Sequence, residues 1–249
     1  MILTFHAIED GPAAVSFPPR LFARGMAVLR DLGYRTIGLE EWVGALRSGG
    51  PLPSHSFVLT FDDGYRSLHA HLGPLLESFG WTATLFLTVG EEDPEAMERP
   101  ARLFGRSLLN WEEIADLRRV GARFGAHSLT HPDLTRLPLR RAEIEVVRSK
   151  AVIERRLGTA VTAFAYPFGR HDTAIRGIVR DHFDCACTDR LGIAGPGSDP
   201  FALERIDAHY LRHERLFAAL ASKWLPLYIA VRAAPRRLKR AVSSRAVGP

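Results

Sequence analysis

The sequence contains few cysteines and offers no disulfide framework. Only two occur, Cys185 and Cys187, and a single residue separates them. That spacing is too short for an ordinary structural disulfide, and two cysteines are too few for a cysteine-rich zinc site. We therefore interpret both as small apolar side chains of a buried strand.

A long apolar run is also missing. The longest candidate, WLPLYIAV at 224–231, has eight residues, whereas a helix needs roughly 20 to cross a bilayer. The first ten residues, MILTFHAIED, have no basic start and reach His6 and Glu9 too early for the apolar centre of a secretion signal. These absences predict a cytoplasmic location.

Most of the chain lacks an excess of positive charge, although the net charge is +5. Six arginines and lysines lie from Arg232 to the end with no acidic residue among them, so the preceding part is near neutral. We therefore expect no nucleic-acid partner. The tail has two interpretations: it contacts the inner face of an anionic membrane, or a last helix packs on the domain and ends in a solvated tail.

Short apolar runs alternate with stretches of helical periodicity over the 249 residues, 46% of which are hydrophobic. This is enough for one sizeable core, and the alternation predicts βα units around a parallel sheet. Helices are expected over about 22–32 and 139–157, each ending at a glycine. The predicted strands lie at 2–5, 35–37, 57–61, 83–86, 123–125, 163–165, 183–187 and 205–206.

Ionisable side chains follow several of the predicted strands. Parallel α/β folds collect functional groups at the carboxyl ends of their strands, because the loops there converge on one face. We therefore expect a common site for the residues at these ends. They are His6, the adjacent acids Asp62 and Asp63, the pair His127 and His131, and the stretch 166–169.

The pair in HSLTH is typical of a metal site when a carboxylate is close by. A spacing of four residues on a helical turn would point His127 and His131 to the same side. Two imidazoles and one carboxylate leave an open position for water on a zinc-like ion. Taken alone, two histidines at this spacing could be ordinary surface residues. Paired acids alone are commonly helix caps. Together they indicate a cation bound by one acid, with the other acid accepting a proton from water.

Three short motifs carry a resemblance to a known family. TFDDG at 60–64, HSLTH at 127–131 and YPFG at 166–169 are similar, in order and separation, to the first three motifs of the polysaccharide deacetylases, which form carbohydrate esterase family 4 with the NodB-homology domain. The flanking ILTFHAI, GYRTIGLEEW and WTATLFLTVG also resemble that family. The similarity extends over residues 1–219, which we predict to be the catalytic domain, with a C-terminal helix and basic tail at 220–249.

The resemblance implies a distorted (β/α)7 barrel in a single domain that hydrolyses an N-acetyl group on a sugar. By the family pattern, Asp63, His127 and His131 bind one divalent metal ion, Zn2+ with Co2+ or Ni2+ as alternatives. Asp62 is then the general base, and the cation offsets the repulsion between the adjacent acids.

Further roles follow from the same resemblance. The backbone N–H of Phe168 would stabilise the oxyanion, and Tyr166 precedes it in the same substrate-facing motif. Family members often use a late histidine as the acid that protonates the departing amine. His209 in ERIDAHY is our candidate, and His213 is the alternative.

The chain departs from the family pattern at two points. Where many members have an arginine that orients the base, this sequence has Ala165. We hypothesise that Arg205, at the end of a late strand, takes that role. The fourth motif is unclear, and CTDR around Asp189 is its nearest match. His6 should face the mouth of the site, where it either contacts substrate or makes a structural hydrogen bond.

Three functions remain open at this point. The favoured one is a metal-dependent deacetylase acting on an N-acetylated polysaccharide, oligosaccharide or lipid-linked sugar in bacterial surface polysaccharide or glycolipid metabolism. The first alternative is a metal-dependent amidase with a non-sugar C–N substrate. The second is a non-catalytic carbohydrate-binding relic, which would not need to retain Asp62. No oligomeric state is predicted.

Overall fold

Seven parallel strands close into a barrel. The structure, a computed structural model, describes residues 1–11, 15–90 and 102–234. The strands follow the order β1-β12-β11-β10-β9-β6-β5, and β5 pairs with β1 to complete the circle. A further parallel strand, β4, pairs with the outer side of β5. The predicted (β/α)7 barrel is therefore confirmed, whereas the basic tail beyond residue 234 lies outside the described residues.

The barrel strands and their connecting helices alternate along the chain. The barrel strands are β1 (Ile2–Phe5), β5 (Ser56–Phe61), β6 (Ala83–Leu87), β9 (Ala122–Ala126), β10 (Ala163–Ala165), β11 (Cys185–Leu191) and β12 (Leu203–Asp207). The short outer strands are β2 (Ala7–Ile8), β3 (Ser16–Phe17), β4 (Arg35–Thr36), β7 (Arg102–Leu103) and β8 (Arg106–Ser107). The helices are α1 (Pro19–Asp31), α2 (Leu39–Ser48), α3 (Ser67–His71), α4 (Gly73–Phe79), α5 (Trp111–Arg119), α6 (Leu139–Leu157), α7 (Thr173–His182) and α8 (Glu214–Ala219). Three 3-10 turns follow strands, η1 (Leu134–Arg136), η2 (Pro167–Gly169) and η3 (Ala208–Leu211).

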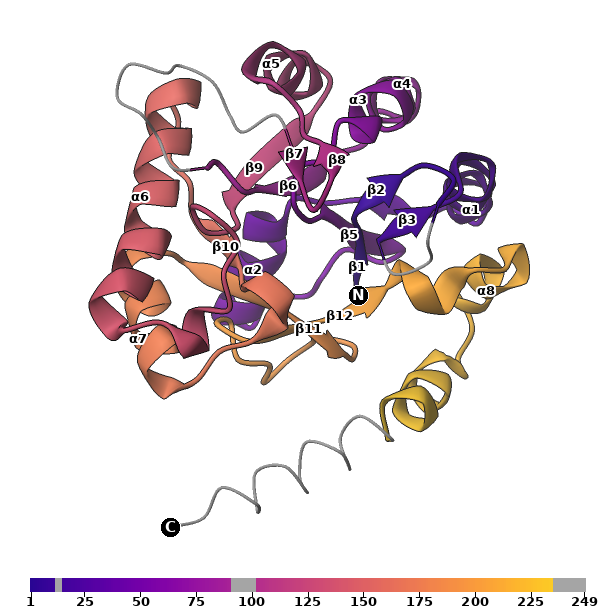
Figure 1. The fold of residues 1–249 in the computed structure, drawn as a ribbon. Coiled ribbons are helices and arrows are strands. Elements are labelled where there is room, and N and C mark those ends of the chain that lie inside the picture. Colours follow the sequence, from indigo (N-terminus) through magenta and orange to yellow (C-terminus); the bar gives the residue numbers. More distant parts are fainter. Residues whose placement is uncertain (12–14, 91–101, 235–249) are drawn as a thin grey trace.

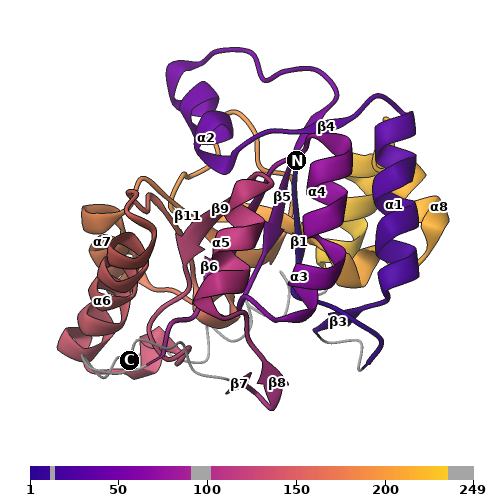
Figure 2. The same ribbon diagram turned by 90° about the horizontal axis from the view of Figure 1, so that it is seen from above.

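Most helices lie around the outside of the strands (Figure 1). The exception is α2, which Figure 2 shows at the end of the barrel near the N-terminus, opposite the β7–β8 hairpin. Trp42 and Val43 of α2 are buried with inward-facing strand residues such as Val58 and Phe86. Because α2 covers the amino ends of the strands, the opposite end is left for the loops that carry chemistry.

The interior of the barrel is filled by side chains and is not a channel. Cys185 and Cys187 are buried there, and both are free thiols. They pack with the side chain of Leu203 from the neighbouring strand. This confirms that the two cysteines are apolar packing residues of a strand.

All eight predicted strands are present, with ends that differ by up to four residues. The helix predicted over 139–157 matches α6 residue for residue. The short strands β2, β3, β7 and β8 were not predicted, because two residues are too few to show a period. A last helix at residues 225–234 follows α8.

Candidate active site

Asp63, His127 and His131 lie together at the carboxyl end of the barrel. The Nε2 atoms of the two histidines are 3.5 and 3.3 Å from Oδ1 of Asp63. One ligand atom from each of the three residues lies within 4.8 Å of the other two. All three side chains are buried. The cluster that the motifs predicted is therefore assembled by strands β5 and β9.

The backbone turns sharply where the two acids leave β5. Asp63 has φ 69° and Gly64 has φ 74°, both in the left-handed region. Glycine takes that conformation at no steric cost, whereas an aspartate there is strained. The turn places Asp62 and Asp63 against different partners, although the residues are adjacent.

The two histidines are not on a helical turn, so that expectation was wrong. Residues 127–131 form a loop after β9, in which Ser128 and His131 have positive φ values of 63° and 61°. The Ser128 hydroxyl accepts the His131 backbone N–H at 3.0 Å. Two left-handed residues fold the loop back on itself and bring the imidazoles together, their ring centroids 4.8 Å apart.

Glu145 of α6 holds this loop from behind. Its carboxylate accepts the backbone N–H groups of Leu129 and Thr130 at 3.0 and 2.8 Å, and the Thr130 hydroxyl at 2.8 Å. The Glu145 side chain is 1% exposed. A buried carboxylate with three donors is a strong fixed anchor, so α6 positions the histidine loop.

The donor set fits a divalent cation. Nδ1 of His127 donates to the Ala165 carbonyl at 2.7 Å. Burial lowers the pKa of His127 to about 4, so the ring is neutral near pH 7 and Nε2 carries a lone pair. That lone pair and the carboxylate oxygen of Asp63 are both acceptors, which repel each other unless a cation lies between them. One carboxylate and two imidazoles are also the ligands of many catalytic zinc sites.

Asp62 turns away from this cluster and meets Arg205. The guanidinium donates from Nη1 to Oδ1 at 2.8 Å and from Nη2 to Oδ2 at 2.6 Å, while its Nε donates to the Thr188 carbonyl at 2.9 Å. Burial alone would raise the pKa of Asp62, but the charge and hydrogen bonds of Arg205 outweigh it and hold that pKa below its usual value. The structure thus brings together the candidate base and the arginine hypothesised to orient it.

His6 follows β1 directly and faces Asp62. Its Nε2 lies 3.9 Å from Oδ2 of Asp62. The His6 side chain is 24% exposed, whereas that of Asp62 is 5% exposed. His6 is therefore the histidine that lies beside the candidate base at an accessible position.

The structure places His209 and His213 elsewhere. His209 is exposed in η3, its ring packs on Tyr210 and its backbone N–H donates to Asp207. His213 accepts a backbone N–H at the start of α8. Both line a pocket of about 260 Å³ against the helix at 225–234. Among the described residues, no recorded hydrogen bond, ion pair or ring contact joins either histidine to Asp62.

The YPFG segment contributes a backbone group and an aromatic ring. Phe168 has φ 55°, and within the described parts of the chain its N–H has no hydrogen-bond acceptor. Its ring is 48% exposed and lies 4.7 Å from that of His131. Tyr166 is buried, and its hydroxyl donates to the Phe201 carbonyl at 3.1 Å. Tyr166 therefore supports the loop from inside.

Phe104 is a residue at this site that the sequence did not single out. It lies at the tip of the β7–β8 hairpin, is 62% exposed, and its ring centroid is 5.3 Å from that of His131 and 6.3 Å from that of Phe168. The described part of the connection between β6 and α5 therefore borders the site. The sequence LFGR at 103–106 could have indicated this residue, because it has a single aromatic side chain before a turn-forming glycine in a polar stretch.

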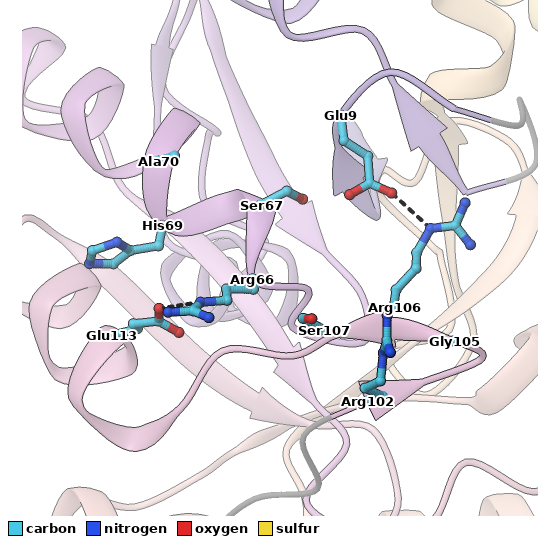
Figure 3. A pocket seen from close by; sticks show the side chains of 10 residues that line it. All are labelled: Glu9, Arg66, Ser67, His69, Ala70, Arg102, Gly105, Arg106, Ser107 and Glu113. Atoms are coloured by element: carbon cyan, nitrogen blue, oxygen red, sulfur yellow. Dashed lines mark hydrogen bonds and ion pairs between the residues drawn. The ribbon is translucent and has the colours of Figure 1, made fainter.

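One ion pair and one backbone hydrogen bond attach this hairpin to the rest of the domain. Figure 3 shows the side chains that line a cavity beside the hairpin. The cavity has a volume of about 590 Å³. In it Arg106 of the hairpin pairs with Glu9 at 2.8 Å, and Arg66 pairs with Glu113 of α5 at 2.6 Å. The Arg66 backbone N–H also donates to the Ser107 carbonyl at 2.9 Å. The hairpin that carries the exposed aromatic ring is thus attached to the segment that follows the paired acids.

Comparisons with known proteins agree with this geometry. The family model described as polysaccharide deacetylase matches residues 49–182. The protein YxkH of Bacillus subtilis (strain 168), named as a polysaccharide deacetylase, is 25% identical over 207 residues, which are 82% of this chain and 70% of that protein.

Two further similarities are informative. The poly-beta-1,6-N-acetyl-D-glucosamine N-deacetylase of Escherichia coli (strain K12) is 31% identical over 121 residues, 47% of this chain. The match spans only 18% of that longer protein. The structure of the Streptococcus pyogenes deacetylase PplD in complex with acetate superposes with a TM-score of 0.73 at 25% identity, covering 83% of this chain and 90% of that one.

Proposed function

The chain belongs to the polysaccharide deacetylase family, and we propose that it removes N-acetyl groups from a bacterial surface polysaccharide or its lipid-linked or oligosaccharide precursor. The observation that carries this proposal is the division of labour between the adjacent acids. Asp63 faces two imidazoles, whereas Asp62 faces an arginine and a histidine. A relic that only bound carbohydrate would not need the second arrangement.

Asp63, His127 and His131 would hold the divalent cation. When bound, the cation would supply Lewis acidity, which would polarise the acetyl carbonyl and make water easier to deprotonate. Zinc suits one carboxylate and two imidazoles, and Co2+ or Ni2+ are the alternatives. The residues of the chain then have to place the substrate and move two protons.

Asp62 accepts the first proton, from the attacking water. Arg205 fixes the plane of the carboxylate through two parallel hydrogen bonds and favours its ionised form. A lowered pKa keeps the base ready but also makes it weak, so the proton stays on Asp62 only transiently. The role of Arg205 is to position the base.

His6 supplies the second proton, to the departing amine. It is the histidine within 3.9 Å of Asp62 and lies at the open side of the site. A proton donor must reach the leaving nitrogen, and the described contacts of His209 give no such path. We therefore propose His6 in the role that the sequence assigned to His209.

The backbone N–H of Phe168 is our candidate for the oxyanion donor. Water adds its oxygen to the acetyl carbon, the C–N bond breaks, and the products are acetate and a free amine. Negative charge builds on the carbonyl oxygen during the addition. A preorganised donor at such a position contributes roughly 3 kcal/mol to transition-state stabilisation.

The exposed rings of Phe104 and Phe168 support a saccharide substrate. Both rings lie against His131, and their own centroids are 6.3 Å apart, so together they form an apolar face at the mouth of the site. The apolar faces of pyranose rings pack on aromatic side chains in the same way as other apolar surfaces. The name of the Escherichia coli relative adds poly-beta-1,6-N-acetyl-D-glucosamine as a substrate to test.

The direct test is acetate release from a panel of N-acetylated compounds. It should contain chitooligosaccharides, beta-1,6-linked N-acetylglucosamine oligomers, a lipid-linked N-acetylated sugar and small non-sugar acetamides. We expect release from at least one sugar class that the variant Asp62→Asn lacks. Turnover of the non-sugar acetamides alone would favour the amidase function, and metal binding without any release would favour the relic.

A further inference from the structure

The helix at residues 225–234 is apolar on two opposite sides. Its inner side carries Leu225, Ile229 and Ala233, which are 9, 3 and 2% exposed and belong to the main core. These residues are spaced by four, so they form one stripe that packs on the domain. The inner stripe alone therefore attaches this helix to the domain, and the residues of its outer side are not needed for that packing.

The outer side presents three large apolar side chains to solvent. Trp224, Leu227 and Val231 are 64, 57 and 64% exposed. Trp224 directly precedes the helix, and its carbonyl accepts the Tyr228 N–H at 3.0 Å. The spacing of three and four residues therefore places the three side chains on one side of this segment. Single exposed apolar residues are ordinary. A contiguous apolar stripe that includes a tryptophan is typical of a surface that binds a membrane or another protein.

Basic residues flank this stripe in the sequence. After Glu214 the sequence has eight arginines and lysines and no aspartate or glutamate. Lys223 lies over the ring of Trp224, and Arg232 over that of Tyr228. An apolar face with tryptophan and flanking basic residues matches the headgroup region of an anionic bilayer, where apolar side chains insert and cations meet lipid phosphate.

The helix is attached at the same end of the barrel as the active site. The Tyr228 hydroxyl donates to the carbonyl of Tyr210 at 3.4 Å, and Tyr210 belongs to η3, which follows the carboxyl end of β12. Arg205 lies in that strand. In Figure 1 the helix is the last yellow coil, at the periphery of the fold after α8.

We propose that the helix at 225–234 seats the protein on an anionic lipid bilayer through Trp224, Leu227 and Val231. No helix among the described residues is long and apolar enough to span a membrane, and the proposed contact lies within the headgroup layer. It goes beyond the deacetylase activity and does not depend on it. A sugar attached to a membrane lipid would then lie near the mouth of the barrel.

The test is flotation of the full chain with lipid vesicles. Vesicles of phosphatidylcholine alone are compared with vesicles that also contain phosphatidylglycerol, at low and high salt. We expect binding to the anionic vesicles that weakens with salt. The triple variant Trp224→Ser/Leu227→Ser/Val231→Ser should bind about tenfold or more weakly, whereas the matched variant Leu32→Ser/Leu139→Ser, at exposed leucines elsewhere, should bind like wild type.

The contribution of charge is tested separately. Lys223→Gln/Arg232→Gln should reduce binding to anionic vesicles more than Arg20→Gln/Arg140→Gln, which removes the same net charge from other exposed positions. If both variants lose vesicle binding equally, net charge alone attracts the protein to the vesicles. That result would overturn the proposal that this face docks on the bilayer.

A second measurement needs no multiple substitution. Trp224 emission should shift to the blue on binding and be quenched by brominated lipid, with Trp224→Phe as the reference. The proposal is overturned if wild type does not float with anionic vesicles, if the triple serine variant floats equally well, or if Trp224 stays in water. It is also overturned if the stripe instead mediates a dimer that the triple variant abolishes. Acetate release is not used as a readout, so failure of the proposed function would be seen separately.

Discussion

Arg205 holds both carboxylate oxygens of Asp62 in a buried, two-pronged pair, at 2.8 and 2.6 Å. Asp62 follows β5 and Arg205 lies in β12, and both strands pair with β1. His6 follows β1 directly and faces Asp62. Three neighbouring strands of the barrel therefore bring the candidate base, the arginine that holds it and the proposed acid to one place.

Replacement of Arg205 should change both stability and the pH profile. Arg205→Met leaves the buried Asp62 without its partner, which costs about 3–5 kcal/mol of unfolding free energy. The lowered pKa of Asp62 adds stability above its unfolded pKa, and that stability is lost as pH falls through the folded value. The variant should lose this contribution, and the acidic limb of its kcat/KM profile should move to higher pH.

The control for this variant is Arg35→Met, which changes an exposed arginine outside the barrel. Denaturant unfolding and the pH dependence of acetate release are measured for both. An unchanged acidic limb in a folded Arg205→Met enzyme would contradict the positioning role, because a merely structural arginine would alter stability alone.

Replacement of His6 should affect turnover, and that of His209 should not. A positioned acid or base contributes typically about 10²–10⁴-fold, so His6→Asn should lower kcat by that range. His209→Asn is the matched control and should retain kcat within about twofold. If His209→Asn loses turnover while His6→Asn keeps it, the acid is the one that the sequence indicated.

Removal of the Glu145 carboxylate should loosen the histidine loop. Glu145→Ala leaves the buried N–H groups of Leu129 and Thr130 without an acceptor, which costs about 1–3 kcal/mol of unfolding free energy. Metal affinity should fall together with stability, because His127 and His131 lie at the two ends of that loop. Glu143→Ala changes an exposed residue of the same helix and should alter neither quantity. Unchanged metal affinity in Glu145→Ala would contradict the anchoring role.

The Phe104 ring should matter for substrate binding more than for chemistry. Aromatic contacts of this kind are worth about 0.5–1.5 kcal/mol, so Phe104→Ala should raise KM for N-acetylated oligosaccharides by about 2- to 12-fold while kcat stays close to wild type. Leu139→Ala, at another exposed apolar side chain, is the control. A fall in kcat with unchanged KM would show that the ring acts through His131 instead.

The sequence was most informative where a local pattern determines structure. The barrel strands appeared as apolar runs, and α6 was predicted residue for residue because periodicity and a glycine stop agree along its length. The four candidate site residues Asp62, Asp63, His127 and His131 were singled out because they follow predicted strands. The deacetylase family was recognised from the same motifs, and the family match confirms it.

Other features depend on backbone conformation or long-range pairing. The loop form of 127–131 rests on two left-handed residues that are not glycine, which spacing alone cannot indicate. The choice between His6 and His209 depends on which strand pairs with β5. His6 follows β1, which pairs directly with β5, whereas His209 follows β12, which pairs with β1 and β11. The contact of the Phe104 ring with His131 depends on where the β7–β8 hairpin lies in the fold, which the local sequence does not indicate. The cytoplasmic location stays a prediction.

The central claim is that Asp63, with His127 and His131, binds the cation while Asp62 works on the water. Metal content per chain and acetate release, measured together for Asp62→Asn and Asp63→Asn, test it most directly. The account predicts that Asp62→Asn keeps its metal and loses turnover by about 10²–10⁴-fold, whereas Asp63→Asn loses the metal itself. Loss of the metal from Asp62→Asn, with retention in Asp63→Asn, would contradict it.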